Sequence, residues 1–296
     1  MTPSRRVVLA AMAGGLLAGC AGQDKTRGGG AVSSGPPSPA ATTAQGKPAS
    51  GPTGGSPTRT LSVTRSEIVA RYGRMAPHSW GFEAPGVVHA LPGGHSGIAL
   101  TFDACGGPGG SGYDSALIDF LRKREVPATL FINSRWIDAN PALFRRLAAE
   151  PLFEIANHGT RHRPLSVTGR SAYGIPGTRS AGEVYDEITG NRAKLTHLLG
   201  APPRFFRSGT AFCDDVAARI VTDLGERFTS FSVNGDGGAT FTPHQVHSAV
   251  ASARGGDIVI CHMNHPRGGT AQGIAAAVPR LLADGHSFVR LSDALH

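Results

Sequence analysis

The chain has 296 residues, 40% of them hydrophobic, which is enough to bury the core of one large domain or two small ones. Four cysteines are too few for a disulfide-held scaffold, and the formal net charge of +8 favours contact with anionic surfaces but is equally explained by solubility. No block of Lys and Arg is long enough to form a binding arm, and aromatic residues are not interleaved with basic ones, so we expect no nucleic-acid partner.

Residues 1–20 have the three parts of a bacterial lipoprotein signal peptide. Arg5 and Arg6 precede an apolar run at residues 7–17, which is too short to span a bilayer as a mature helix. The following Leu-Ala-Gly-Cys resembles a lipobox, in which the cysteine, here Cys20, is lipidated and becomes the new N-terminus. We therefore expect an exported, membrane-anchored lipoprotein at the bacterial cell envelope. An ordinary signal peptide is the alternative, and the arginine pair leaves both the general secretory and the twin-arginine routes open.

Residues 21–60 are mostly Gly, Pro, Ser, Thr and Ala, and no aromatic residue occurs before Tyr72. Such a segment cannot bury enough apolar area to offset the entropy of ordering it, so we expect a disordered tether. A tether gives the domain that follows, residues 61–296, reach around its membrane anchor.

Residues 61–296 alternate between short apolar runs and longer amphipathic stretches. The apolar runs predict strands at residues 97–103, 128–133, 153–157, 204–207, 228–233, 257–262 and 287–290. The amphipathic stretches predict helices at residues 114–124, 141–149, 181–199, 214–224, 243–253 and 274–283. This alternation predicts an α/β fold with parallel strands covered by helices, and the length favours closure into a barrel over an open sheet.

Ionisable side chains follow five of the predicted strands. In chain order they are Asp103, His158 and His162, Arg207, Asp236, and His262. The carboxyl ends of parallel barrel strands open at one mouth, so these side chains should converge there. Two histidines four residues apart on a helical turn face the same way and can share one metal ion. Alone, such a pair is more often two solvent-facing histidines, but its position after a buried strand favours the metal site.

These segments, in this order, resemble the motifs of the polysaccharide deacetylase (NodB-like, carbohydrate esterase family 4) family. The matches are Asp103 to the first Asp of Thr-Phe-Asp-Asp, His158 and His162 to the H-[S/T]-x-x-H metal pair, Arg207 to the third motif, and residues 260–262 to Leu-x-His. Gly159 stands where the metal motif usually has Ser or Thr. The resemblance runs from residue 97 to the C-terminus, roughly two thirds of the chain.

The resemblance implies a distorted (β/α)7 TIM-like barrel, known as the NodB homology domain. It also implies a divalent metal, most often Zn²⁺, held through His158 and His162. The implied reaction is hydrolysis of N-acetyl or O-acetyl groups on a cell-wall or extracellular polysaccharide, and it does not extend to peptide bonds.

The sequence departs from the family at the second Asp of the first motif, a metal ligand that is replaced here by Ala104. A methyl group cannot bind a cation, which leaves three alternatives. Another oxygen, from Asp236, Asp114 or Asp103, completes the site; or the two histidines and water hold the metal weakly; or the protein no longer catalyses a reaction. The glycine-rich residues 104–110 either let backbone N–H groups approach a ligand or form a mobile loop.

We expect Asp103 to act as general base and His262 to protonate the departing amine as general acid. Arg207 would hold Asp103 ionised, and Asp236 would raise the pKa of His262. The alternatives are a structural ion pair for Arg207 and a turn residue for Asp236.

Further polar residues near these motifs are candidates for substrate binding. His265 follows His262 closely, and Tyr173 lies in the long loop at residues 163–180, which is either a recognition loop or disordered.

The remaining cysteines, Cys105, Cys213 and Cys261, fall at strand ends. An exported protein would pair two of the three, and we favour Cys105 with Cys213, with three reduced thiols as the alternative. Cys261 alternates with His262 along its strand, so its side chain should point away from the barrel mouth.

Together these features predict a monomeric, metal-dependent hydrolase whose partners are an acetylated polysaccharide and, through its lipid anchor, the membrane. Ala104 favours one rival, a non-catalytic glycan-binding lipoprotein on the same barrel. The other rival is a hydrolase of small amides, but small substrates do not need the reach of a tether.

Overall fold

The computed structural model describes residues 63–296, so the predicted signal peptide, Cys20 and the tether lie outside the described residues. The main sheet consists of β2 (Gly97–Ala104), β3 (Ala128–Ile132), β4 (Phe153–Asn157), β5 (Phe205–Phe206), β7 (Arg227–Phe228), β8 (Val233–Asn234), β9 (Ile258–His262) and β10 (Ser287–Val289). A second, two-stranded sheet pairs β1 (Trp80–Gly81) with β6 (Cys213–Asp214) in antiparallel orientation.

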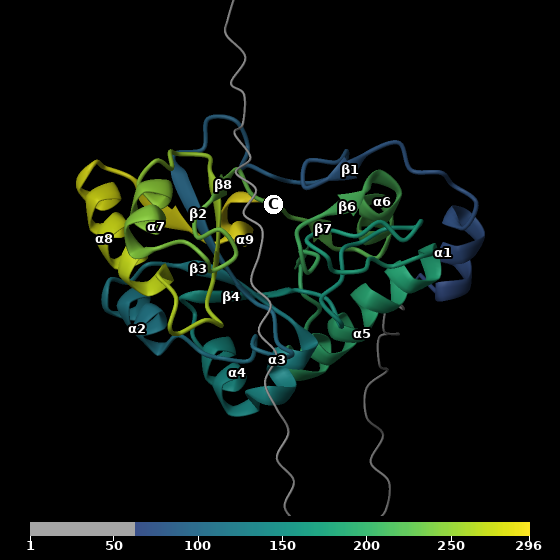
Figure 1. The fold of residues 1–296 in the computed structure, drawn as a ribbon, viewed down its shortest axis with the longest axis horizontal. Coiled ribbons are helices and arrows are strands. Elements are labelled where there is room, and N and C mark those ends of the chain that lie inside the picture. The colour runs from purple at the N-terminus through teal and green to yellow at the C-terminus, as the bar shows by residue number, and fades with distance from the viewer. Residues whose placement is uncertain (1–62) are drawn as a thin grey trace, which may run out of the picture. The chain divides into compact units, whose positions relative to one another are not determined.

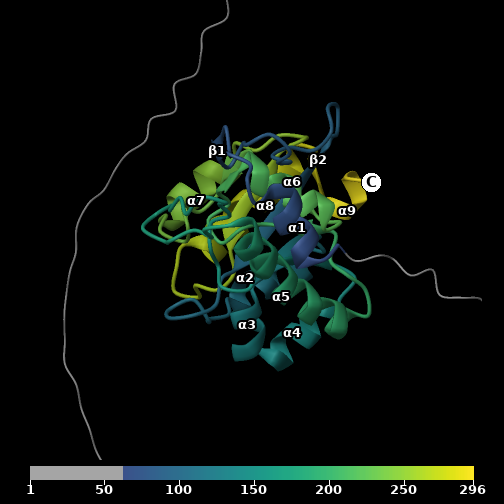
Figure 2. The same ribbon diagram turned by 90° about the vertical axis from the view of Figure 1, so that its right-hand side faces the viewer.

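The helices that accompany the strands are α1 (Arg65–Tyr72), α2 (Ser115–Lys123), α3 (Ser134–Ala139), α4 (Pro141–Ala148), α5 (Ala181–Leu199), α6 (Asp215–Asp223), α7 (Pro243–Val250), α8 (Thr270–Ala283) and α9 (Leu291–Ala294). Helices α2, α7 and α8 pack together at one end of the sheet, and α1, α5 and α6 pack together at the other (Figures 1 and 2). Among residues 63–296, no helix combines the length and the hydropathy that a membrane crossing needs.

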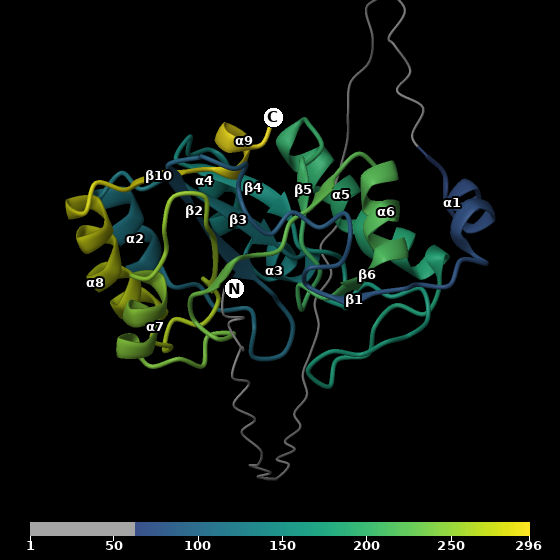
Figure 3. The same cartoon turned by 90° about the horizontal axis from the view of Figure 1, so that it is seen from above.

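Every pair of neighbouring strands in the main sheet is parallel, as the alternation of strands and helices predicts. The strand order is β7-β5-β4-β3-β2-β9-β8, and β10 pairs with the first residues of β2. Strand β2 therefore lies in the middle of the sheet, with helices on its outer side (Figure 3). Its central position makes the residues at its carboxyl end neighbours of several other strands.

The predicted strand at residues 228–233 is wrong as a single strand, because the chain bends within it. Strand β7 pairs with β5, whereas β8 pairs with β9 at the other end of the strand order. Between them, Thr229 N donates to Phe206 O at 2.8 Å and Ser232 N donates to Ile258 O at 2.9 Å. One bent segment thus joins both ends of the sheet, which confirms the distorted barrel predicted from the sequence.

Side chains along β2 alternate between the outside and the inside of the barrel. Ile98, Leu100, Phe102 and Ala104 are fully or almost fully buried and belong to the largest apolar cluster, which they share with residues of α2, α7 and α8. Ala99 belongs to a separate cluster with inward residues of β3, β4, β5 and β9, and side chains of α9 complete that cluster. Apolar packing therefore fills one end of the barrel, and polar residues remain at the other.

Helices α1, α3 and α9 were not predicted from the sequence, and α8 begins at Thr270, four residues before the predicted start. The start of α1 nevertheless has a recognisable signal. Thr64 accepts a hydrogen bond from Glu67 N while the Glu67 carboxylate accepts one from Thr64 N, which is a complete capping box. The other predicted helices and strands are present, with ends that shift by a few residues.

Candidate active site

The predicted site residues gather at the carboxyl ends of the strands, around a pocket of about 650 Å³. Its lining includes Asp103, Cys105, His162, Tyr173, His262 and His265. His158 and Arg207 lie beneath it and are fully buried. The structure therefore brings together the side chains that the sequence places after separate strands.

Asp103 is the last inward-facing residue of β2, and Arg207 binds it directly. Arg207 Nη1 donates to Asp103 Oδ1 at 2.7 Å, and both side chains are buried. Burial alone would raise the pKa of Asp103, but Arg207, His158 and His262 together outweigh it and hold that pKa below its ordinary value. Asp103 is therefore ionised at neutral pH and able to accept a proton.

Each nitrogen of the Arg207 guanidinium donates at least one hydrogen bond, although the side chain has no exposed surface. Nη1 also donates to Thr101 Oγ1 at 2.9 Å, Nε donates to Thr229 O at 3.1 Å, and Nη2 donates to Ser230 O at 2.8 Å. Its carbon lies 4.0 Å from the centre of the Phe131 ring. A buried charge is stable only when it is paired and hydrogen-bonded in this way, so the ion pair with Asp103 is structural as well as electrostatic.

His158 follows β4, and its two ring nitrogens have different partners. Nδ1 donates to the backbone carbonyl of Arg207 at 3.0 Å, which leaves Nε2 as the nitrogen with the free lone pair. His158 Nε2 lies 3.5 Å from Asp103 Oδ2 and 3.8 Å from Cys105 Sγ. Burial disfavours a charged ring, but these acidic neighbours raise the pKa of His158, so they favour a positive charge at this point.

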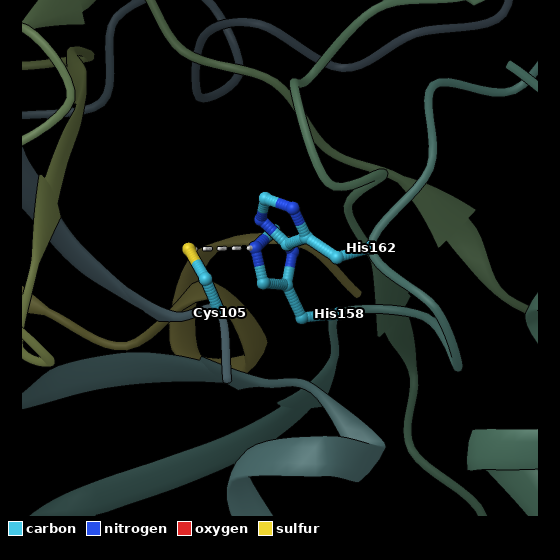
Figure 4. A group of neighbouring side chains, drawn as sticks. All are labelled: Cys105, His158 and His162. Atoms are coloured by element: carbon cyan, nitrogen blue, oxygen red, sulfur yellow. Dashed lines mark hydrogen bonds between the residues drawn. The ribbon is translucent and has the colours of Figure 1, made fainter. Parts of the chain in front are cut away.

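His162 lies beside His158, with the ring centres 4.9 Å apart and the planes nearly perpendicular. Its Nε2 atom is buried and has no hydrogen-bond partner among residues 63–296. Cys105 Sγ completes the group, because one donor atom from each of Cys105, His158 and His162 lies within 4.8 Å of the others (Figure 4). These three side chains form a candidate metal site, which we call the donor cluster.

His262 ends β9 and is the in-register neighbour of Asp103 on β2. His262 Nδ1 donates to Asp236 Oδ1 at 2.9 Å, and His262 N donates to Asp236 Oδ2 at 2.6 Å. Thr270 Oγ1 donates to Asp236 Oδ2 at 3.0 Å. Burial opposes the charged imidazolium, but the Asp236 carboxylate, with a smaller contribution from Cys105, outweighs it and raises the pKa of His262 well above its ordinary value. His262 is thus a protonated acid at neutral pH.

The two predicted substrate-binding residues lie at the wall of the pocket. Tyr173 is 77% exposed, and its ring meets the edge of the Phe212 ring at a centre distance of 5.5 Å. The His265 ring lies 6.5 Å from the His262 ring, and Asn264 Nδ2 lies 3.4 Å from His265 Nε2. Both residues are in position to contact a molecule bound in the pocket.

Comparisons with known proteins agree with this arrangement. The sequence profile of the family described as polysaccharide deacetylase matches residues 91–229, which include Asp103, His158, His162 and Arg207. Residues 91–229 belong to the polysaccharide deacetylase family. This match confirms the family predicted from the sequence. His262 and Asp236 lie beyond the matched region.

Individual relatives of known kind match most of the described region. A peptidoglycan-N-acetylglucosamine deacetylase of Bacillus cereus is 25% identical over 71% of this chain and 92% of its own length. A bifunctional xylanase/deacetylase of Pseudobutyrivibrio xylanivorans is 23% identical over 66% of this chain, which spans only 30% of that relative. Among solved structures, a family 4 pseudoenzyme of Bacillus anthracis shares the fold with a TM-score of 0.60 and 19% identity, over 72% of this chain and 70% of its own.

The position of the missing second Asp of the family motif faces the outer side of β2. The Ala104 side chain is fully buried in the outer apolar cluster, whereas the next residue, Cys105, returns to the pocket. Of the oxygens predicted as replacements, those of Asp236 bind His262 and Thr270, and Asp114 Oδ1 caps α2. Asp114 Oδ2 has no partner among the described residues, and Asp103 Oδ2 lies 3.5 Å from His158 Nε2. Sequence analysis missed Cys105 as a donor, although the period of two from Asp103 could have identified it.

The predicted disulfide between Cys105 and Cys213 is wrong, since Cys105, Cys213 and Cys261 are all free. Cys213 belongs to the apolar cluster of α1, α5 and α6, where burial raises the pKa of its thiol well above the ordinary value. Cys105 instead meets the histidines, which lower the pKa of its thiol well below the ordinary value despite burial. Cys261 faces the outer cluster, away from the pocket, as predicted.

Glu187 is a positioning residue that the sequence analysis did not identify. Its carboxylate, on α5, accepts hydrogen bonds from Arg161 N at 2.9 Å and Arg163 N at 3.3 Å, on either side of His162. Gly159 has a φ of +76°, and a Cβ there would lie 2.6 Å from Glu187 Oε1. The glycine that replaces the usual Ser or Thr therefore admits the Glu187 carboxylate, which holds the loop carrying His162.

Proposed function

We propose that the protein is a metal-dependent deacetylase that hydrolyses acetamido groups on a cell-wall or extracellular polysaccharide. One observation carries the proposal: a carboxylate held ionised by Arg207 and an imidazole held protonated by Asp236 face the same pocket from adjacent strands. Amide hydrolysis needs this combination, because one group must remove a proton from water and another must deliver a proton to the leaving nitrogen.

The donor cluster is suited to a divalent metal. His162 Nε2 is a buried nitrogen without a partner among the described residues, and His158 Nε2 has its lone pair free. The backbone carbonyl that accepts from His158 Nδ1 is the kind of outer partner that orients metal-binding histidines. A bound metal would polarise the acetyl carbonyl and make water more acidic, which is the chemistry that such ions supply to hydrolases.

Two side chains, Asp103 and His262, each carry out one of the two proton transfers. Asp103 accepts a proton from the attacking water as the new C–O bond forms at the acetyl carbon. His262, charged and held through Nδ1 by Asp236, presents its other ring nitrogen to the leaving amine and donates a proton as the C–N bond breaks. The products are acetate and a free amine, so water and one amide bond are consumed.

Acetate release provides the test of this proposal. The full chain carrying Cys20→Ala, which prevents lipidation, would be incubated with N-acetylglucosamine oligomers or peptidoglycan, with Zn²⁺ or Co²⁺ supplied. We expect acetate from at least one polymer, and none when Asp103 and His262 are both replaced. Glycan binding without acetate release, whichever metal is added, would identify a glycan-binding protein on the same fold. Release from small amides alone would identify a small-amide hydrolase.

We further propose that Cys20 carries the lipid anchor at the cell envelope. The charged, apolar and small-residue parts of residues 1–20, followed by the tether composition of residues 21–60, support this proposal. Labelled palmitate should enter the parent protein in bacterial cells, and Cys20→Ala should abolish both the labelling and the membrane fraction. Secretion of an unlabelled parent protein would contradict the anchor.

A further inference from the structure

The donor cluster combines two ring nitrogens with one sulfur. Cys105 directly follows β2, and its Sγ lies 3.8 Å from His158 Nε2, with His162 completing a group whose donor atoms are all within 4.8 Å (Figure 4). Cys105 is only partly buried, and it lines the pocket that also contains Asp103 and His262. The sulfur thus lies where a pocket ligand and a metal ion would meet.

The two nitrogens are directed at the same point by their surroundings. His158 cannot turn its ring without losing the bond from Nδ1 to the Arg207 carbonyl. His162 has a left-handed backbone conformation, with φ of +61°, and the Glu187 carboxylate fixes the residues on both sides of it. A strained backbone that is held in this way indicates a side chain whose position matters.

A third ligand that carries a negative charge would balance the cation, and most carboxylate oxygens near the pocket have other partners. Asp103 Oδ2 lies 3.5 Å from His158 Nε2, but Asp103 does not belong to the group whose donor atoms all lie within 4.8 Å of one another. Asp103 Oδ1 binds Arg207, and both oxygens of Asp236 bind His262, with Thr270 as an additional donor. Asp114 Oδ1 accepts from Leu117 N at the start of α2. Asp114 Oδ2 has no partner among the described residues, but Asp114 does not line the pocket. A cysteine thiolate carries the same single negative charge as the carboxylate that the family motif would supply, so it balances the cation equally well.

We propose that Cys105 Sγ is the third protein ligand of the metal, which makes this a two-histidine, one-cysteine site that selects Zn²⁺, Co²⁺ or Cd²⁺ over Mg²⁺ and Mn²⁺. The inference rests on the metal dependence proposed above. Thiolate is a soft donor that favours Zn²⁺ and similar ions, whereas Mg²⁺ and Mn²⁺ prefer carboxylate and water. Catalytic zinc sites with three protein ligands of this mixed type leave one position open for substrate.

Cobalt substitution gives a direct readout of the metal–sulfur bond, independent of catalysis. The full chain carrying Cys20→Ala would be loaded with Co²⁺, and we expect a thiolate-to-cobalt charge-transfer band in the near ultraviolet. Cys105→Ser should abolish the band and weaken Zn²⁺ binding by at least about 100-fold, since even outer-shell partners cost 10- to 100-fold. Cys105→Asp should keep metal binding, lose the band and shift preference towards Mn²⁺.

Cys261→Ala is the matched control, because this thiol lies on neighbouring β9 but faces the outer apolar cluster. It should keep both the band and the affinity for Zn²⁺. Absence of the band in the Co²⁺-loaded parent would overturn the inference, and so would its persistence in Cys105→Ser. The parent spectrum needs no substitution, so the first outcome can be observed even if a variant folds poorly.

Acetate release measured on the same samples separates this inference from the proposed function. Release without a sulfur band would disprove thiolate ligation and leave the deacetylase standing. A sulfur band without release from any glycan would support the ligand and disprove the deacetylase.

Discussion

The two sides of the pocket use the same residue type for opposite purposes. On the donor-cluster side, His158 binds a neutral backbone carbonyl through Nδ1, and the negative charges of Asp103 and Cys105 lie near its free Nε2. On the acid side, His262 binds the Asp236 carboxylate through Nδ1. A proton on His158 Nε2 would therefore occupy the place that a metal ion would take. On His262, Asp236 holds the Nδ1 proton away from the pocket. The far ring nitrogen has a neutral carbonyl as its partner in His158 and a carboxylate in His262, and the carboxylate is what stabilises the charged acid.

Asp103 lies between the two sides, and its replacement should have the largest effect. Asp103→Asn keeps an acceptor for Arg207 but cannot take a proton, so kcat/KM for an acetylated oligomer should fall by about 10³- to 10⁴-fold. Bound zinc, measured by mass spectrometry, should stay at the parent level, because the donor cluster is intact. Asp138→Asn, a surface acid paired with Lys194, is the control. Loss of zinc together with activity would show that Asp103 is a ligand.

His262 tests the acid side alone. His262→Gln should lower kcat/KM for the acetamide substrate by about 10²- to 10³-fold, because an amine leaves poorly without a proton. The same variant should lose less than about tenfold on nitrophenyl acetate, since a phenolate leaves without protonation. Equal losses on both substrates would contradict the role of His262 as general acid.

Asp236 tests the acid side of the pocket through the pH dependence of kcat/KM. The carboxylate raises the pKa of His262, so the charged acid persists above the ordinary histidine range and is lost only as pH rises through the raised pKa. Asp236→Asn lowers that pKa, so the alkaline limb of the kcat/KM profile should move to lower pH, with a loss of about tenfold at neutral pH. An unmoved alkaline limb would assign that limb to another group.

Glu187 should give the smallest effect, confined to the donor-cluster side. Glu187→Gln retains one acceptor oxygen but turns an amide towards the backbone N–H groups of the loop, at a cost of about 1–3 kcal/mol in the free energy of unfolding. Zinc affinity should fall several-fold, and the pH profile should stay unchanged. Glu183→Gln, which alters a more exposed acid on the same helix, is the control. A shifted pH profile in the Glu187 variant would show that the two sides are not independent.

The sequence predicts most of the barrel because local signals and packing agree there. Strands β2, β3 and β4 are short, mostly apolar segments, and α5 begins after Ser180 and ends before Gly200 as predicted. The bend between β7 and β8 could not be predicted, because it depends on pairing with two strands that are distant in sequence. Helix α9 is equally non-local, since its residues are fixed by the apolar cluster inside the barrel.

The residues of the candidate site likewise include some that the sequence predicts and some that it does not. Family motifs identify Asp103, His158, His162 and His262, because each follows a strand whose carboxyl end opens at the mouth. Cys105 was assigned to a disulfide because counting cysteines ignores which face of β2 each residue occupies. Glu187 carries no motif, and only the fold of α5 against the loop shows that its carboxylate reaches Arg161 N and Arg163 N.

The bend between β7 and β8 has a consequence for the chemistry of the pocket. Residues there leave one strand partner before joining the next, so the carbonyls of Thr229 and Ser230 are not used up in a regular ladder. Those two carbonyls are the ones that accept from Arg207 Nε and Nη2. In a symmetrical barrel these carbonyls would accept hydrogen bonds from neighbouring strands, and the Arg207 guanidinium would lack acceptors. The irregular closure of the sheet thus supplies the acceptors that hold the Arg207 charge beneath the Asp103 carboxylate.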